Sequence, residues 1–276
     1  MLAAWVNGAR AGSIGLADRG LHYGDGLFET IGASEGRARF LAAHLARLSH
    51  GCAALAIPVP APEVLRLEIA RAAQLAPRVL VKVIVTRGDA IERGYAYSGA
   101  ETPTRIVCAY AWPEGPDGVR PPARAALAAL RSGRPLLAGV KHLNRLEQVL
   151  ARQEARQRGL DEVILAGDGH CIAGGSMTNV FALAAGRLVT PPVAHCAVAG
   201  VLRGQLLAAA SHLGLATSEQ PLKRADLVEA EALWLTNARV GVWPVATFED
   251  RIYAAHEYTP LMQQAVHEAA HGRIDA

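Results

Sequence analysis

A lysine in an apolar stretch is the residue of this sequence best suited to covalent chemistry. Lys141 lies within Ala138–Arg152, AGVKHLNRLEQVLAR, just before a predicted helix. A lysine at such a place is either a solvated residue at the start of a helix or a buried amine. Burial can lower the pKa of an amine from about 10.4 by several units, which makes it a nucleophile and a base. Spacing alone favours the solvated interpretation, so the neighbouring residues have to decide.

Three further features of the sequence are suited to binding an anion. Arg47 lies on a predicted amphipathic helix over residues 41–56, and Asn237 follows a predicted strand. Gly200 precedes a predicted helix over 201–213. A glycine turn into a helix N-terminus presents free N–H groups and the positive end of the helix dipole to an anion. Taken singly, these features also fit an exposed helix arginine, a turn asparagine and an ordinary helix start.

The elements that must position these residues are helices and strands in mixed order. Apolar residues at helical spacing predict the helix over 41–56, and the β-branched run Val79–Thr86 predicts a strand. The elements do not follow strict βαβ alternation, which favours the α+β class. The other predicted strands cover 5–6, 28–33, 37–40, 105–111, 162–165, 180–183, 188–189, 233–236 and 242–245, and the other helices 63–75, 144–158 and 260–270.

One proline-rich segment predicts a domain boundary. Residues Trp112–Arg124, WPEGPDGVRPPAR, include four prolines and two glycines and cannot form a helix or a central strand. We therefore expect a smaller N-terminal α/β domain over 1–111, a linker over 112–124, and a larger C-terminal α/β domain over 125–276 that carries Lys141.

Composition narrows the function classes. The 276 residues are 51% hydrophobic with a formal net charge of +3, so a full core can be buried and an anionic small molecule suits the charge. Scattered basic residues give no compact footprint for nucleic acid. The four cysteines form no C-x-x-C pair, so a zinc site is not suggested. Without a signal-peptide pattern or an apolar run of roughly 20 residues, we expect a cytoplasmic protein that is not bound to a membrane.

The run around Lys141 closely resembles a known family of enzymes. GVKHLNRLEQVLAR is similar to the aminodeoxychorismate lyases, which are pyridoxal-phosphate enzymes of fold type IV, and more loosely to the D-amino-acid and branched-chain aminotransferases of that fold. The resemblance extends over nearly the whole chain. Residues 18–30 match the family's D-R-G-x-x-x-G-D-G-x-F-E-T block, 44–48 its H-x-x-R-L helix, and 179–181 its N-[IVL]-F strand.

The resemblance implies a two-lobed α+β fold and a role for each candidate residue. Lys141 would bind pyridoxal 5′-phosphate (PLP) covalently and act as the catalytic group. An arginine in the loop after Val79–Thr86 suits a substrate carboxylate because its planar guanidinium matches that group. The resemblance places the cofactor phosphate on Arg47, the backbone amides of Val201 and Leu202, and Asn237, and it places the substrate beside Phe28, Thr30, Arg93 and Tyr95.

The implied reaction is conversion of 4-amino-4-deoxychorismate to 4-aminobenzoate and pyruvate, a step of folate biosynthesis, by a homodimer. An aminotransferase on the same fold is the first alternative, and a non-catalytic PLP-binding protein is the second. One position departs from the family pattern. The glutamate that usually bonds the pyridine nitrogen, five residues before the asparagine of N-[IVL]-F, is Gly174 here. Its loss bears on how strongly the ring attracts electrons.

Overall fold

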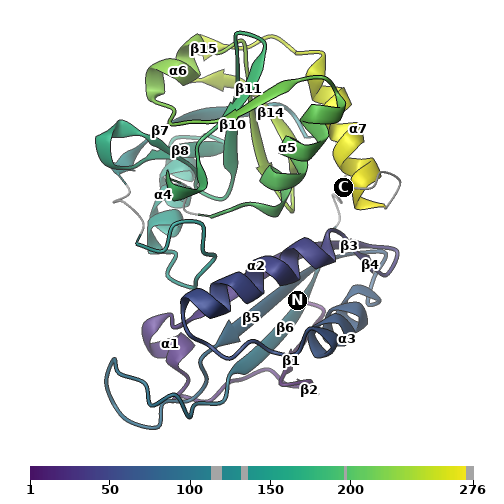
Figure 1. Ribbon diagram of the computed structural model, residues 1–276, viewed down its shortest axis with the longest axis vertical. Helices are drawn as coiled ribbons and strands as arrows, with labels where there is room; N and C mark the ends of the chain where they lie inside the picture. The colour runs from purple at the N-terminus through teal and green to yellow at the C-terminus, as the bar shows by residue number, and fades with distance from the viewer. Residues whose placement is uncertain (113–119, 132–135, 196–197, 272–276) are drawn as a thin grey trace. The chain divides into compact units, whose positions relative to one another are not determined.

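The structure, a computed structural model, describes residues 1–112, 120–131, 136–195 and 198–271. Its contacts divide the chain into two compact units (Figure 1). The first consists of Met1–Asp117 and Val140–Asn144, and the second of Gly118–Gly139 and Arg145–Ala276. The expected boundary over 112–124 stays a prediction, since 113–119 lie outside the described residues. Lys141 was expected in the C-terminal domain, but its contacts group it with the first unit.

An antiparallel sheet forms the centre of the first unit, with strand order β2-β1-β6-β5-β3-β4. Helices α2 and α3 cover one of its faces (Figure 1). The strands are β1 (Ala3–Val6), β2 (Ala9–Arg10), β3 (Gly26–Ser34), β4 (Arg37–Ala38), β5 (Arg78–Thr86) and β6 (Thr104–Ala111), and the helices are α1 (Arg19–Tyr23), α2 (Leu41–Ala54) and α3 (Pro62–Ala73).

Alternation along β5 explains how this sheet buries one face. Val79, Val81, Val83 and Val85 are fully buried towards the helices, whereas Lys82 between them is only half-buried on the other face. Side chains on a strand alternate between faces, so this period of two fixes which residues each face presents.

The second unit is built on a mixed sheet with strand order β12-β11-β10-β13-β14-β7-β8-β9, to which β15 is added beside β14. Since β9 ends this path but reaches the inner strand β10 through a short turn, the sheet must curl on itself. The strands are β7 (Ala123–Arg131), β8 (Glu162–Ala166), β9 (Ile172–Gly175), β10 (Asn179–Ala184), β11 (Arg187–Thr190), β12 (Ala216–Glu219), β13 (Ala232–Asn237), β14 (Gly241–Phe248) and β15 (Arg251–Ile252).

Helices complete the second unit. Helix α4 packs its buried Ala151 and Ala155 on Val163 and Leu165 of β8. Helix α5 packs on α7 (Figure 1) and on β13. A large apolar core lies between the strands and includes Phe248. The helices are α4 (Leu146–Gln157), α5 (Val201–His212), α6 (Arg224–Glu229) and α7 (Tyr258–Ala270), with short 3₁₀ turns η1 (Asp168–His170) and η2 (Val193–His195).

The expected α+β class is confirmed by these two mixed units. The helix expected over 144–158 begins later, at Leu146, because Asn144 is engaged elsewhere: its Nδ2 donates to the carbonyl of Gly24. The short elements α1, β2, β9, β12, α6 and β15 were not expected from the sequence, since a few residues carry no periodic signal.

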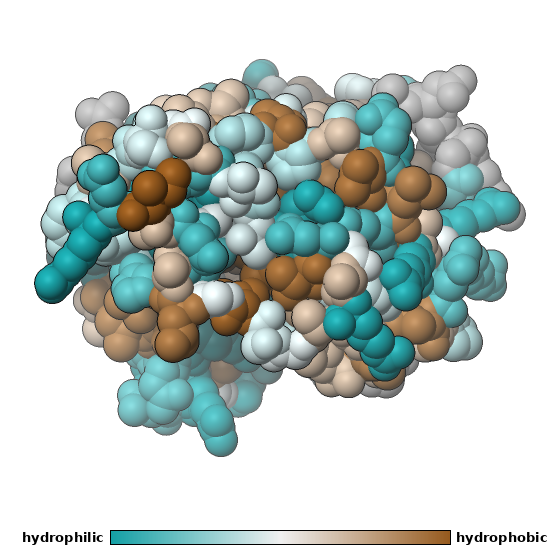
Figure 2. Space-filling view, turned by 90° about the horizontal axis from the view of Figure 1, so that it is seen from below, coloured by the Kyte–Doolittle hydropathy of each residue, from teal (hydrophilic) through white to brown (hydrophobic). Residues whose placement is uncertain are grey.

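Much of the described surface mixes apolar with hydrophilic side chains. On the face shown in Figure 2, apolar groups are interspersed with hydrophilic ones. Exposed large apolar residues of the first unit include Leu16, Leu21, Ile91 and Tyr95. Scattered exposure of this kind is usual for folded proteins. No helix among the described residues is both long and apolar enough to cross a membrane.

Candidate active site

The segment that contains Lys141 lies along the edge of the first sheet, beside β3. The amide of Phe28 donates to the carbonyl of Lys141 at 3.0 Å, and the amide of Leu143 donates to the carbonyl of Gly26 at 2.9 Å. These two bonds frame an antiparallel bridge between Leu27 and His142. The predicted catalytic lysine is therefore fixed by its main chain to the strand that carries Phe28.

Glycines at the start of β3 allow this close approach. A Cβ on Gly26 would lie 2.5 Å from the carbonyl oxygen of Val85 and 2.9 Å from Leu143. Gly24 ends α1 in the left-handed conformation, with φ 62°, and a Cβ there would lie 2.6 Å from Asn144. The two glycines on either side of Asp25 thus leave the room that the lysine segment occupies.

Three predicted site residues share one face of this sheet. Cross-strand partners point to the same side, so Lys141 lies on the face of Phe28, and Thr30 is two residues further along β3. The Nζ atom of Lys141 is 4.2 Å from the centroid of the Phe28 ring. Lys82 of β5 lies on the same face, with its Nζ 5.3 Å from that ring. This face, opposite to α2 and α3, therefore presents an amine beside an aromatic ring.

Arg47 lies on the other face and is held by a buried carboxylate. Its Nε donates to Oε1 of Glu29 at 2.8 Å and its Nη2 to Oε2 at 2.5 Å. His44, one turn earlier on α2, bonds the same Oε2 through Nδ1 at 2.7 Å. Glu29 and His44 are each 1% exposed. The arrangement fixes the guanidinium of the predicted phosphate ligand in one orientation.

Electrostatics in this buried group favour a charged Glu29 and a neutral His44. Burial alone would raise the pKa of Glu29, but the hydrogen bonds from Arg47 and His44 outweigh it and lower the pKa to about 2. Burial lowers the pKa of His44, against the raising effect of Glu29, and the positive charges of Arg47 and Lys141 lower it further. At neutral pH the Glu29 carboxylate is therefore charged and the His44 imidazole is neutral.

The predicted carboxylate ligands Arg93 and Tyr95 lie on the long connection from β5 to β6. Both are exposed, and the ring centroid of Tyr95 lies 5.4 Å from that of Tyr23 in α1. The structure thus gives this loop a contact with the D-R-G block.

In the second unit, the start of α5 is positioned by Asn179. The Nδ2 of Asn179 donates to the carbonyl of Val198 at 3.0 Å, and a Cβ on Gly200 would lie 2.0 Å from its Oδ1. Only glycine permits this approach. The first amides of the helix, those of Val201 and Leu202, belong to the turn that lacks intrahelical acceptors. These are the amides expected to bind phosphate.

Asn237, a predicted phosphate ligand, uses its side chain to stabilise a turn. Its Oδ1 accepts from the amides of Arg239 at 2.8 Å and Val240 at 2.9 Å, and its Nδ2 donates to the carbonyl of Met177 at 3.1 Å. Beside it, the Thr236 hydroxyl is buried without a hydrogen-bond partner among the described residues. Thr236 pairs with Asn179 across the sheet. An unsatisfied hydroxyl costs free energy when it is buried, so this place fits a polar cofactor group.

A second buried carboxylate supports the turn that joins β9 to β10. Glu162, fully buried, accepts from the amides of Ser176 at 3.0 Å and Met177 at 3.3 Å and from both the Ser176 hydroxyl and the Thr178 hydroxyl. Gly174, which precedes the turn, has φ +140°, and a Cβ there would lie 2.9 Å from the carbonyl oxygen of Thr178. The backbone therefore disfavours any side chain, glutamate included, at this position.

Comparison with known proteins identifies the family. Residues 26–248 match the model of the amino-transferase class IV family. The chain belongs to the amino-transferase class IV family. Its cofactor is accordingly pyridoxal 5′-phosphate, and the expected fold-type IV architecture is confirmed.

Relatives of this class IV family member include both activities considered above. It is 33% identical to an aminodeoxychorismate lyase of Vibrio harveyi, over 88% of this chain and 90% of the relative. It is 31% identical to a putative branched-chain-amino-acid aminotransferase of Methanocaldococcus jannaschii, over 87% and 84%. The crystal structure of 4-amino-4-deoxychorismate lyase from Pseudomonas aeruginosa matches with a TM-score of 0.88 and 36% identity, over 96% of this chain and 98% of that one.

The sequence of this class IV family member did not reveal the roles of three polar residues. Glu29 follows Phe28 directly, and strand alternation places it towards α2, where His44 and Arg47 occur one helical turn apart. That spacing was a usable signal. Glu162 and Thr236 gave none, because their roles depend on how the curled sheet brings strand ends together.

Proposed function

We propose that this member of the amino-transferase class IV family is a PLP-dependent aminodeoxychorismate lyase, which converts 4-amino-4-deoxychorismate to 4-aminobenzoate and pyruvate. The observation that carries the proposal is the amine of Lys141 beside Phe28, on the face of the first sheet opposite to α2 and α3. The similarity to two lyases, at 33% and 36% identity, supports it.

The chain's own residues would bind both the cofactor and the substrate. Arg47, the amides of Val201 and Leu202, and Asn237 would bind the cofactor phosphate, while Lys141 anchors the cofactor covalently. Bound PLP supplies an electron sink for the negative charge that develops on the substrate's ring carbon. The face bearing Phe28 and Thr30 would line the substrate, and Arg93 with Tyr95 would bind a carboxylate.

Lys141 has a second task in this proposal. With its amine free, Lys141 would take the proton from the ring carbon that bears the substrate's amino group. The electron pair of the broken C–H bond moves towards the neighbouring carbon, whose C–O bond breaks. Pyruvate leaves as its enol and takes up a proton on the way to the keto form, and the ring becomes aromatic. Aromatisation supplies driving force.

The position of Gly174 favours a lyase over an aminotransferase. An acid at the ring nitrogen strengthens the electron sink, and transamination depends on it more because the cofactor carbon must be reprotonated. Elimination can proceed at once by expelling pyruvate. A glycine whose conformation disfavours a glutamate is more compatible with the lyase. An aminotransferase remains the second candidate, favoured by the similarity to the Methanocaldococcus protein.

One assay decides between these functions. Purified holoenzyme is supplied with aminodeoxychorismate, and pyruvate and 4-aminobenzoate are measured together; equal amounts of both are expected. The same preparation is tested for amino-group transfer from amino acids to keto acids. Transfer without pyruvate release would favour the aminotransferase. A purified protein that takes up no PLP and shows no colour would contradict both enzyme functions.

A homodimer and a cytoplasmic location also remain proposals. For a dimer the described surface offers an apolar stripe on α4, where Leu146, Val149 and Leu150 are each more than half exposed. Their i, i+3, i+4 spacing places them on one side of the helix, away from the buried Ala151 and Ala155. Light scattering of the wild type and of Leu150→Glu tests this assembly, and a shift to monomer is expected in the variant.

A further inference from the structure

The connection between β5 and β6 is the longest described segment of the first unit without regular secondary structure. It runs from Arg87 to Pro103. A compact domain seldom contains a loop of this length unless the loop is functional or disordered. This loop is bonded to buried charged side chains.

Arg19 of α1 binds three consecutive carbonyls of this loop. Its Nη1 donates to Gly94 and to Ala96, both at 3.1 Å, and its Nη2 donates to Tyr95 at 2.7 Å. The side chain of Arg19 is only 4% exposed. The loop main chain thus wraps around a buried guanidinium.

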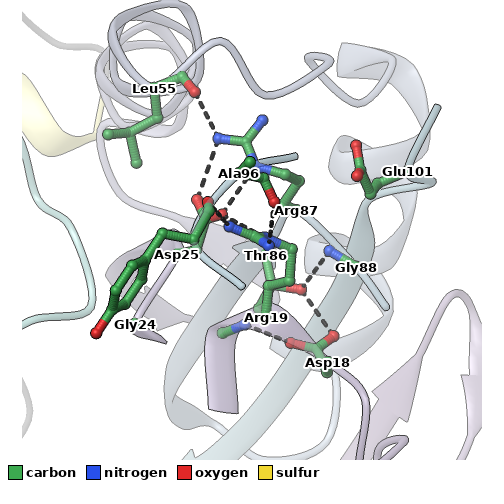
Figure 3. Close-up of polar contacts among 12 residues, drawn as sticks. Asp18, Arg19, Gly24, Asp25, Leu55, Thr86, Arg87, Gly88, Ala96 and Glu101 are labelled. Carbon is green, nitrogen blue, oxygen red and sulfur yellow. Dashed lines mark hydrogen bonds and ion pairs between the residues drawn. The ribbon is translucent and has the colours of Figure 1, made fainter. Parts of the chain in front are cut away.

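A single carboxylate joins this guanidinium to a second one. Asp25 accepts from Nε of Arg19 at 2.9 Å and from Arg87 at 2.8 and 3.1 Å (Figure 3). Arg87 also donates to the carbonyls of Leu55 at 2.7 Å and Ala56 at 2.9 Å, beyond the end of α2. Burial would raise the pKa of Asp25, but the bonds from the two arginines lower it. The loop is therefore tied through charged groups to α1 and α2.

Further contacts fix the rest of the loop. The Tyr97 ring centroid is 3.7 Å from the guanidinium of Arg87. Glu101 accepts from the amides of Ser98 at 2.7 Å and Gly99 at 2.9 Å. The guanidinium carbon of Arg19 also lies 4.9 Å from the centroid of the Tyr23 ring, and that ring contacts the ring of Tyr95.

We propose that Arg19 is a positioning residue, which holds the loop so that Arg93 and Tyr95 stand ready to bind a substrate carboxylate. The proposal rests on the function proposed above. Burying a guanidinium against carbonyls is costly unless its hydrogen bonds are satisfied, and here these bonds order the three residues that directly follow Arg93. A recognition loop ordered in advance does not lose that conformational entropy on binding. Arg19 itself need not touch the substrate.

The experiment compares Arg19→Met with Arg105→Gln in the holoenzyme. Arg105 forms an ion pair with Glu68 at 3.1 Å in the same unit and makes no described contact with the loop. Asp25 keeps Arg87 in the Arg19→Met variant, so no carboxylate is left without a partner. Trypsin cleavage after the exposed Arg93 reports loop order, and steady-state kinetics separate KM from kcat.

We expect Arg19→Met to raise the rate of cleavage after Arg93 roughly tenfold, as local opening becomes easier. KM for aminodeoxychorismate should rise about tenfold with kcat changed less than about twofold, the pattern of lost binding. Arg105→Gln should match the wild type in both. Arg19→Lys keeps the charge beside Asp25 but lacks the planar fork, so it should show most of the loss.

Defined outcomes overturn the proposal. Unchanged cleavage in Arg19→Met shows that Arg19 does not hold the loop, and faster cleavage with an unchanged KM shows that the held loop does not bind substrate. If Arg19→Met does not fold, Tyr97→Ala replaces it in the experiment, since the Tyr97 side chain is exposed. This variant must raise the cleavage rate and KM, by smaller factors than those expected for Arg19→Met. Wild-type values of both in Tyr97→Ala would contradict the proposal. Wild-type enzyme without pyruvate release refutes the proposed function, while cleavage still decides whether Arg19 holds the loop.

Discussion

Arg47 and Glu29 form a two-point ion pair, with guanidinium Nε and Nη2 at 2.8 and 2.5 Å from the two carboxylate oxygens. The pair joins the helix α2 to the strand β3, whose opposite face carries Phe28. Any change to Arg47 therefore acts on a predicted phosphate ligand and on a buried charge at once, and the two effects have to be separated.

Arg47→Ala is expected to weaken PLP binding roughly tenfold to a hundredfold, since a charge-assisted contact contributes about 1.5–3 kcal/mol. It should also lower the free energy of unfolding, because Glu29 loses its stronger partner. The double variant Arg47→Ala/Glu29→Gln should regain part of the stability without regaining affinity. Cofactor titration and thermal unfolding of the apoenzymes measure the two effects. An unchanged PLP affinity in Arg47→Ala would remove this residue from the phosphate site.

Acid should destabilise the protein through Glu29. Its pKa in the folded state is about 2, below the ordinary value of 4.5, so the unfolded chain binds a proton more readily. The stabilisation is complete above about pH 4.5 and is lost as pH falls towards 2, with a slope of at most about 1.4 kcal/mol per pH unit. Denaturant unfolding at several pH values should show a flatter dependence for Glu29→Gln in this window. Equal slopes for variant and wild type would contradict the assignment.

Lys141→Ala should abolish turnover and the covalent link to PLP that borohydride reduction traps. Lys82→Ala is the matched control, because its amine lies on the same face, 5.3 Å from the same Phe28 ring. Mass spectrometry of the reduced, digested protein locates the label. Labelling of Lys82 or Lys223 in the Lys141→Ala protein, with turnover retained, would show that the lysine is assigned wrongly.

Gly174→Ala should destabilise the fold by roughly 1–2 kcal/mol or more, since φ +140° is unfavourable for a residue with a Cβ. Gly204→Ala is the control. Gly204 lies within α5, where a Cβ meets nothing within 4 Å, and alanine should stabilise the helix by about 0.5–1 kcal/mol. Thermal unfolding compares the two. Equal melting temperatures for Gly174→Ala and the wild type would show that the backbone tolerates a side chain.

Gly174→Glu should therefore fold poorly. If a folded fraction is recovered, restoring an acid should raise any transaminase activity relative to lyase activity, and both rates are measured on that fraction. A native enzyme whose transamination of ordinary amino acids already exceeds pyruvate release would reverse the order of the two proposed functions.

Local patterns predicted the α+β class and most of the long elements. The apolar spacing of α2 and the β-branched run of β5 reflect side chains that face a core, and that signal lies within a few residues. The attachment of Lys141 to β3 was not predictable in this way, because its partners Gly26 and Phe28 are more than a hundred positions away in sequence. Likewise, the carbonyls bound by Arg19 are backbone atoms, which leave no mark on residue type.

The chain passes into the first unit twice, and the short return at Val140–Asn144 has a consequence for dissection of the protein. A single truncation cannot produce the first unit with the edge of its sheet covered. A fragment that stops before the second unit lacks Val140–Asn144, the segment that pairs with β3. A fragment ending near residue 112 would expose the backbone N–H and C=O groups at the start of β3. Unpaired strand edges recruit other chains, so such a fragment should aggregate unless the return segment is supplied as a peptide. During synthesis, this edge can form only after both β3 and the segment Val140–Asn144 have left the ribosome.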